Sequence, residues 1–245
     1  MNAGIRPLAA TGSTDDVAAR LGDPAALLTD VELGRAQRLR SSSDRSDFMA
    51  AHGLVRLVAG QLLGCGPDDL TVVQRCARCG GPHGQPYIAE QPALQVSWSH
   101  TRGYVAAIAG FVPVAVDVEH PPPVPVDGAL LRLVLSPSEQ SVVAAAPDPS
   151  RAFARHWVRK ESLVKLGMAT LDTMATTELD GLAVDSSWLA IGGHRRLTWR
   201  GWYLVEWSDA ASATVGTAMA AIPTSLIRIG ATSPDRLVAI GQLPT

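Results

Sequence analysis

Along this 245-residue chain, the spacing of the apolar residues changes from a helical to an alternating pattern, and this change occurs twice. A helical spacing over 44–64 gives way to short alternating runs at 94–98, 104–109 and 114–119. A second helical spacing over 151–166 is followed by alternating runs in the last third of the chain. Because the order helix and then small sheet occurs twice, we predict an α+β fold of two similar halves. Each half would be a small, mostly antiparallel sheet packed with helices.

The boundary between the halves is predicted where Phe111, Val112 and Pro113 interrupt two strands. We therefore divide the chain into residues 1–112 and 113–245. In the second part, Gly192-Gly193 predicts a hairpin turn. The strands predicted there lie at 188–191, 195–199, 203–207 and 214–221.

Composition narrows the class of protein. The formal net charge is −2, which disfavours a nucleic-acid partner. No apolar run reaches the length of about 18 residues that predicts a membrane span. The N-terminus lacks the pattern of a signal peptide, and three cysteines do not predict a disulfide framework. We expect a monomeric cytoplasmic protein with no membrane partner.

Two carboxylates stand on one face of the strand predicted at 114–119. In the sequence VAVDVE the valines take one face, while Asp117 and Glu119 share the other. Neighbouring carboxylates repel each other unless a cation lies between them. A pair of solvated acids at a strand end is the alternative for this motif alone.

A third carboxylate lies in the helix predicted at 151–166, where Trp157, Glu161 and Lys165 share one face. Lys160 and Lys165 are the only lysines in a chain that otherwise uses arginine. An ordinary helix pair of Glu161 and Lys165 would need no lysine, because arginine serves equally well. Three carboxylates and a lysine together predict a Mg²⁺ site for phosphates.

These motifs resemble a known family. VAVDVE and WVRKESLVK are similar to the two signatures of 4′-phosphopantetheinyl transferases, loosely (V/I)G(V/I)D(V/I)E and WxxKExxxK. Upstream, SWSHTRGYVAAIAG at 97–110 resembles the SH segment of the family, and GQPYI at 84–88 resembles its G(K/R)P loop. The resemblance covers residues 30–167. Size and organisation resemble the surfactin-synthetase-activating type, which implies an intramolecular pseudo-dimer.

The resemblance implies a reaction and a metal site. The enzyme would transfer 4′-phosphopantetheine from coenzyme A to a serine of an apo acyl or peptidyl carrier protein and release 3′,5′-ADP. Asp117, Glu119 and Glu161 would hold Mg²⁺, and Lys165 would contact the pyrophosphate and protonate the leaving phosphate. Glu161, or a water on the metal, would take the proton of the serine. Lys160 would be a helix-surface or supporting residue.

The resemblance also implies contacts to coenzyme A. Ser99 and His100 would face its 3′-phosphate, with Arg35 nearby and Arg56 as a weaker candidate. Gln85 replaces the usual basic residue of the G(K/R)P loop, so one expected phosphate contact is missing.

Other interpretations remain at this stage. A Mg²⁺-dependent nuclease also combines acids with a lysine, and a non-enzymatic coenzyme A-binding module would need no converging acids. Cys76, Cys79 and His83 suggest a zinc site with Cys65 as a fourth ligand, but a Gly/Pro-rich turn with buried thiols is favoured.

Overall fold

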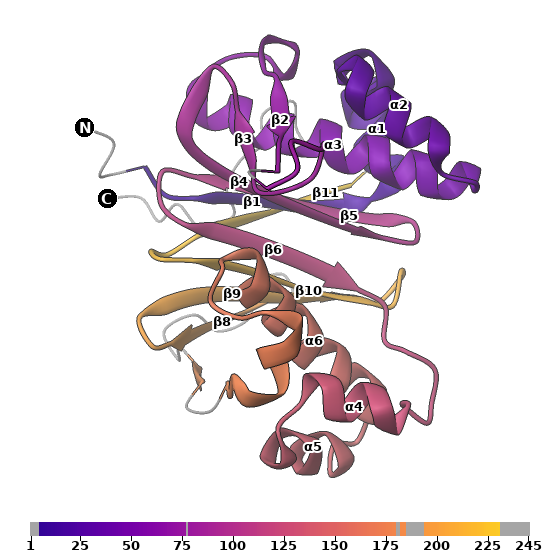
Figure 1. Ribbon diagram of the computed structural model, residues 1–245, viewed down its shortest axis with the longest axis vertical. Helices are drawn as coiled ribbons and strands as arrows, with labels where there is room; N and C mark the ends of the chain where they lie inside the picture. Colours follow the sequence, from indigo (N-terminus) through magenta and orange to yellow (C-terminus); the bar gives the residue numbers. More distant parts are fainter. Residues whose placement is uncertain (1–4, 77, 180–181, 185–193, 231–245) are drawn as a thin grey trace.

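The computed structural model describes residues 5–76, 78–179, 182–184 and 194–230 (Figure 1). Two sheets form the centre, and each carries helices on its outer side, which confirms the predicted α+β class. The pseudo-dimer remains a prediction. No helix among these residues is both long and apolar enough to span a bilayer.

The first sheet contains six strands in the order β11-β1-β5-β4-β3-β2. It is antiparallel except that β1 pairs with β11 in parallel. Its strands are β1 (Leu8–Ser13), β2 (Val72–Gln74), β3 (Pro86–Ile88), β4 (Gln91–Thr101), β5 (Tyr104–Gly110) and β11 (Ser225–Ile229). The division at 112/113 remains a prediction, and β11 returns to the sheet of the first half.

The second sheet has the order β6-β10-β9-β8-β7 and is antiparallel. The predicted strand at 188–191 and the turn at Gly192-Gly193 lie outside the described residues. Its strands are β6 (Val114–Glu119), β7 (Ala183–Val184), β8 (His194–Trp199), β9 (Trp202–Asp209) and β10 (Thr214–Ala220).

On the first sheet pack the helices α1 (Thr14–Leu21) and α3 (Ser42–Leu63), and α2 (Asp30–Arg38) packs on α3. The long helix predicted at 44–64 is confirmed as α3. Its N-terminus is capped by the Ser41 hydroxyl, and Gly64 ends it in the left-handed conformation that glycine adopts easily. Short 3₁₀ turns lie at Pro24–Leu27 and Pro67–Asp69.

On the second sheet, α6 (Pro149–Lys165) packs against β6 and β10, and α4 (Gly128–Val134) and α5 (Pro137–Ala144) pack on α6 (Figure 1). The helix predicted at 151–166 is confirmed as α6. A 3₁₀ turn at Leu171–Thr176 follows it.

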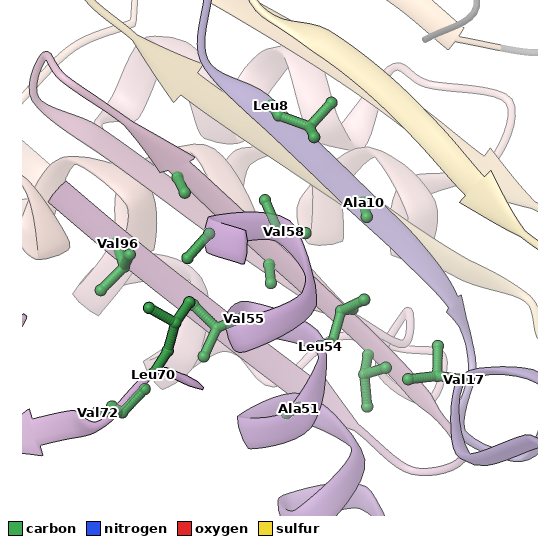
Figure 2. Packing of buried hydrophobic residues seen from close by; sticks show 14 of the residues in the cluster. Leu8, Ala10, Val17, Ala51, Leu54, Val55, Val58, Leu70, Val72 and Val96 are labelled. Atoms are coloured by element: carbon green, nitrogen blue, oxygen red, sulfur yellow. The ribbon is translucent and has the colours of Figure 1, made fainter. Parts of the chain in front are cut away.

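Period-two alternation in β1 and β5 divides their side chains between two cores. Ala10, Val105 and Ala107 face α3, whose residues Leu54 and Val58 pack on them (Figure 2). The other faces of the same strands meet the valines of β6 between the two sheets. This second core contains Ala9, Ala106, Ile108, Val114, Val116, Val118 and Val205. Burial of the β6 valines fixes its acidic residues on the opposite face.

Candidate active site

The two acids of β6 lie opposite hydroxyl groups of β4, across the junction of the two sheets. The Ser99 hydroxyl donates a hydrogen bond to Asp117 Oδ1 over 2.7 Å, and the Thr101 hydroxyl donates to Glu119 Oε1 over 2.6 Å. The backbone N–H of His120 also donates to Glu119 Oε1, over 2.8 Å. These bonds orient both carboxylates toward the same edge of β6.

Lys165 ends α6 beside these acids. Its ammonium donates to Asp117 Oδ1 and to the carbonyl of Val116, both over 2.8 Å, and to the carbonyl of Trp98 over 3.4 Å. The side chain is about a quarter exposed, at 28%. An ammonium held this way keeps access to solvent and to a ligand.

Glu161 lies one helical turn before Lys165 and is half-buried. Burial raises the pKa of Glu161, and the negative charges of Asp117 and Glu119 add to the rise, while Lys165 opposes it. The three predicted acids and the lysine therefore share one electrostatic neighbourhood.

The donor set fits Mg²⁺, which prefers carboxylate oxygens and keeps several waters or substrate oxygens. The three acids do not have all their ligand atoms within 4.8 Å of one another; among the described residues, only Cys76, Cys79 and His83 meet that distance. Lys165 instead contacts Asp117, so the lysine partly neutralises the acids here.

Two cavities flank this cluster. A cleft of 760 Å³ is bordered by His100, Thr101 and Glu119 on the strand side and by Trp157 of α6. A second cavity of 460 Å³ is bordered by Lys165, Gln85 and other residues of β4 and of the loop before β3. Glu119 thus borders the first cavity, and Lys165 borders the second.

His100 follows Ser99 on β4 and is exposed at the cleft. Loss of solvent from the side of the ring that packs against protein lowers the pKa of His100; Asp47 opposes that change, while Lys165 reinforces it. Water screens these effects at an exposed ring, so its position at the cleft matters more than its titration.

Arg35 of α2 lies over the Phe48 ring, 5.3 Å from the centroid, and donates to Gln74 Oε1 over 2.6 Å. It borders a cavity of 180 Å³ with Gln74 and Pro82. Gln74 in turn donates to the carbonyl of Gly84 over 3.2 Å, which links Arg35 to the loop before Gln85.

Arg56 is fully buried, which removes it from the predicted phosphate contacts. Its guanidinium donates to both carboxylate oxygens of Glu32 and to the carbonyls of His52 and Leu70. The helical pattern of α3 does not reveal this burial, because Glu32 of α2 and Leu70 lie outside the helix.

Lys160 is also fully buried, so of its two predicted roles, helix-surface or supporting residue, the first is wrong. The ammonium donates to Glu139 Oε2 over 2.5 Å and to the carbonyls of Val134 and Met174, both over 2.8 Å. Lys160 therefore supports α6 from inside, and Lys165 alone of the two lysines faces the acids.

Thr101 and His120 are site residues that the sequence analysis missed. A signal for Thr101 was present, because Ser97, Ser99 and Thr101 alternate along β4 and share one face. His120 contributes its backbone N–H, which carries no sequence signal.

Comparison with known proteins supports one family. A model described as the 4′-phosphopantetheinyl transferase superfamily matches residues 113–215, a segment that contains Asp117, Glu119, Glu161 and Lys165. This match supports assignment of the chain to the 4′-phosphopantetheinyl transferase superfamily. It is also 26% identical over 170 residues to the 4′-phosphopantetheinyl transferase HetI of Nostoc sp. (strain PCC 7120), covering 67% of this chain and 68% of HetI.

The two comparisons support a 4′-phosphopantetheinyl transferase, an enzyme class that modifies carrier proteins with a group from coenzyme A. The surfactin-synthetase-activating subtype remains a prediction.

Proposed function

We propose that this transferase is Mg²⁺-dependent and moves 4′-phosphopantetheine from coenzyme A to a serine of an apo acyl or peptidyl carrier protein, releasing 3′,5′-ADP. The observation that carries the proposal is the meeting of β6 and α6, where Asp117 contacts Lys165 beside Glu119 and Glu161. Cavities on two sides leave room for two substrates.

Asp117, Glu119 and Glu161 are the residues that would hold the metal. Mg²⁺ bound there would orient the pyrophosphate and neutralise its charge. Positioning and charge neutralisation account for most of the catalysis of phosphoryl transfer, so the chain needs no covalent nucleophile of its own.

Lys165 would change partners when coenzyme A binds. Its ammonium, now on Asp117, would donate to a pyrophosphate oxygen and then give its proton to the leaving phosphate of 3′,5′-ADP. Glu161 would take the proton of the carrier serine. The serine oxygen forms a bond to the pantetheine-linked phosphorus while the anhydride P–O bond breaks, so one proton is accepted and one is given.

Ser99, His100 and Arg35 are proposed to bind the 3′-phosphate. His100 is exposed at the 760 Å³ cleft, while Arg35 is anchored on Phe48 and Gln74. In a test of this contact, 3′-dephospho-coenzyme A should bind more weakly than coenzyme A, and the difference should shrink in His100→Ala. Equal affinity of the wild type for both ligands would remove these residues from the site.

The decisive experiment incubates the enzyme with coenzyme A, Mg²⁺ and a panel of apo carrier domains, with intact mass as the readout. Asp117→Ala and Glu161→Ala should reduce the transfer rate by orders of magnitude, because each removes a metal ligand. Thermal melting of both variants checks that they fold. Near wild-type turnover in a normally folded variant would contradict the metal assignment.

A further inference from the structure

The loop between β2 and β3 contains a cluster of two thiols and an imidazole that the transferase reaction does not use. Ligand atoms of Cys76, Cys79 and His83 all lie within 4.8 Å of one another. Cys79 Sγ is 3.0 Å from Nε2 of His83. The predicted turn with buried thiols is wrong, because Cys79 is exposed and Cys76 is only half-buried.

We propose that Cys76, Cys79 and His83 form a Zn²⁺ site, with solvent as the fourth ligand. Thiolate and imidazole ligands suit Zn²⁺ and disfavour Mg²⁺, so this site would be chemically distinct from the carboxylate cluster. The proposal does not depend on the proposed function.

The spacing of the ligands suits one tetrahedral ion. A sulfur at about 2.3 Å and a nitrogen at about 2.0 Å from Zn²⁺ lie about 3.5 Å apart at a tetrahedral angle. The Sγ and Nε2 atoms of Cys79 and His83, now 3.0 Å apart, need only a small outward shift to reach that geometry.

The backbone of the loop already has the turn that such a site needs. The N–H groups of Arg78 and Cys79 hydrogen-bond to the side chain of Cys76, which stabilises a thiolate there. The N–H of Gly80 donates to the carbonyl of Cys76 over 2.8 Å, and Gly80 has a φ of 68°. These contacts hold Cys76 and Cys79 on the same side of the turn.

Glycine keeps the remaining ligand close. A Cβ added to Gly81 would lie 3.2 Å from the His83 ring and 3.3 Å from the Cys79 sulfur. The N–H of Cys76 donates to the carbonyl of Gly81 over 2.9 Å and closes the loop on itself. A larger residue at position 81 would therefore crowd the metal ligands.

Cys65 does not belong to this cluster. It lies after α3 and is exposed, and the group within 4.8 Å contains the other three residues alone. The earlier suggestion of Cys65 as a fourth ligand is therefore not supported, and Cys65 serves as a matched control. Solvent reaches the cluster because Cys79 and His83 are exposed.

A bound ion would fix the loop that leads into Gln85. Gly84 follows His83 directly, and its carbonyl accepts from Gln74, which also accepts from Arg35. Zn²⁺ would thus order the rim of the cavity that contains Lys165 without contacting the carboxylates. Zn²⁺ should also stabilise the folded protein by mass action.

The test measures metal content and the Co²⁺ spectrum of the full chain, purified under reducing conditions. We expect about one Zn²⁺ per chain in the wild type and in Cys65→Ser. Cys76→Ser and Cys79→Ser should lose it, and His83→Ala should bind it at least tenfold more weakly. Circular dichroism checks the fold of each variant.

Titration of the metal-free protein with Co²⁺ gives a second readout. Thiolate ligation produces intense charge-transfer bands in the near ultraviolet, whereas Co²⁺ bound only to carboxylates does not. The bands should persist in Glu161→Gln and disappear in Cys79→Ser. The proposal is overturned by absent thiolate bands, by equal metal loss in Cys65→Ser, or by a Cys76–Cys79 disulfide in place of the metal after purification.

Discussion

In both halves of the molecule, a buried acid on a short helix pairs with a cation on the following long helix, beside a histidine. The cation differs between the halves. In the first half, Glu32 of α2 pairs with Arg56 of α3 over 2.6 Å. His52, one turn before Arg56, contacts the same carboxylate over 2.6 Å. Glu32 is also the acidic member of a capping box with Thr29, so one side chain caps α2 and joins it to α3.

The second half repeats this arrangement on α5 and α6. Glu139 forms a capping box with Ser136 and pairs with Lys160, whose ammonium lies 2.5 Å away. His156, one turn before Lys160, lies farther from the acid, with Nδ1 3.8 Å from the carboxylate. The order along the chain and the helical spacing are the same as in the first half.

This repetition is what an internal pseudo-dimer would have, and it supports that prediction. The difference between the halves comes directly after the cation. Leu57 and Gln61 of α3 occupy the positions that Glu161 and Lys165 occupy in α6. The same kind of helix support therefore serves both halves, whereas the groups proposed for catalysis stand in only one.

The largest effect is expected from breaking each buried pair. Arg56→Met and Lys160→Met should each destabilise the protein by about 3–5 kcal/mol, because an uncompensated carboxylate stays buried. Urea unfolding followed by circular dichroism measures the loss. If either variant loses less than about 1 kcal/mol, that pair is not a structural support.

A double variant separates the charge from the packing. Adding Glu32→Gln to Arg56→Met, or Glu139→Gln to Lys160→Met, removes the unpaired charge and should recover part of the lost stability. No recovery in one half would show that packing around the cation, rather than its charge, holds that helix.

The next effect concerns catalysis at matched positions of the two helices. Lys165→Ala should slow transfer to an apo carrier by about 10²–10³-fold, because it removes the proposed proton donor and the positive charge proposed to contact the pyrophosphate. Gln61→Ala, at the matching position of α3, should leave the rate within about twofold. Equal losses in both variants would contradict the assignment of chemistry to α6 alone.

Local patterns predicted the elements of the halves better than their pairing. The alternation of β6 and the spacing of α6 revealed Asp117, Glu119 and Glu161, because each signal lies within one element. β1 was missed, since Leu8–Ser13 contains alanine, glycine and serine in place of β-branched apolar residues. β11 was missed because its partner β1 lies at the other end of the chain, and local periodicity carries no information on such pairing.

Burial of the two cations was unpredictable for the same reason. Helical geometry rotates Lys160 away from Glu161, but it does not say what covers that side. The cover comes from Glu139 and the carbonyls of Val134 and Met174, which belong to other elements. Likewise, Ser99 reaches Asp117 only because strands of two different sheets meet.

A smaller effect is expected from pH, and it distinguishes the two histidines. Burial and the charge of Arg159 lower the pKa of His156 to about 4, against the opposing effect of Glu139. In the unfolded chain, His156 binds a proton once the pH falls below its ordinary pKa of 6.5. In the folded chain, the same ring stays neutral until about pH 4. Stability should fall by at most about 3 kcal/mol as the pH drops through this window.

His156→Gln should flatten that slope when unfolding is measured between pH 6.5 and 4.5. His52 provides the comparison, because burial lowers its pKa too, but hydrogen bonding to Glu32 opposes the change. Because His52 lies 2.6 Å from the Glu32 carboxylate, whereas His156 lies 3.8 Å from that of Glu139, we expect His52→Gln to change the slope less. A steeper contribution from His52 would mean that its contact with Glu32 does not favour the charged ring.

The smallest effect is expected from exchanging the two cations. In Lys160→Arg, a guanidinium must enter a closed pocket that now presents three acceptors to one ammonium. Overpacking there should cost about 1–3 kcal/mol.

In the reverse exchange, Arg56→Lys, a single ammonium must replace a guanidinium that donates to both oxygens of Glu32 and to the carbonyl of Leu70. Loss of one or two of these bonds should cost about 1–2 kcal/mol. Each pocket thus specifies its own cation by shape, since the net charge is unchanged in both exchanges. Chemical unfolding of the two variants, each against Lys160→Met or Arg56→Met as the charge-loss control, measures the difference. If both exchanges prove neutral, a positive charge alone is sufficient, and the chain's use of lysine at position 160 has no basis in the shape of its pocket.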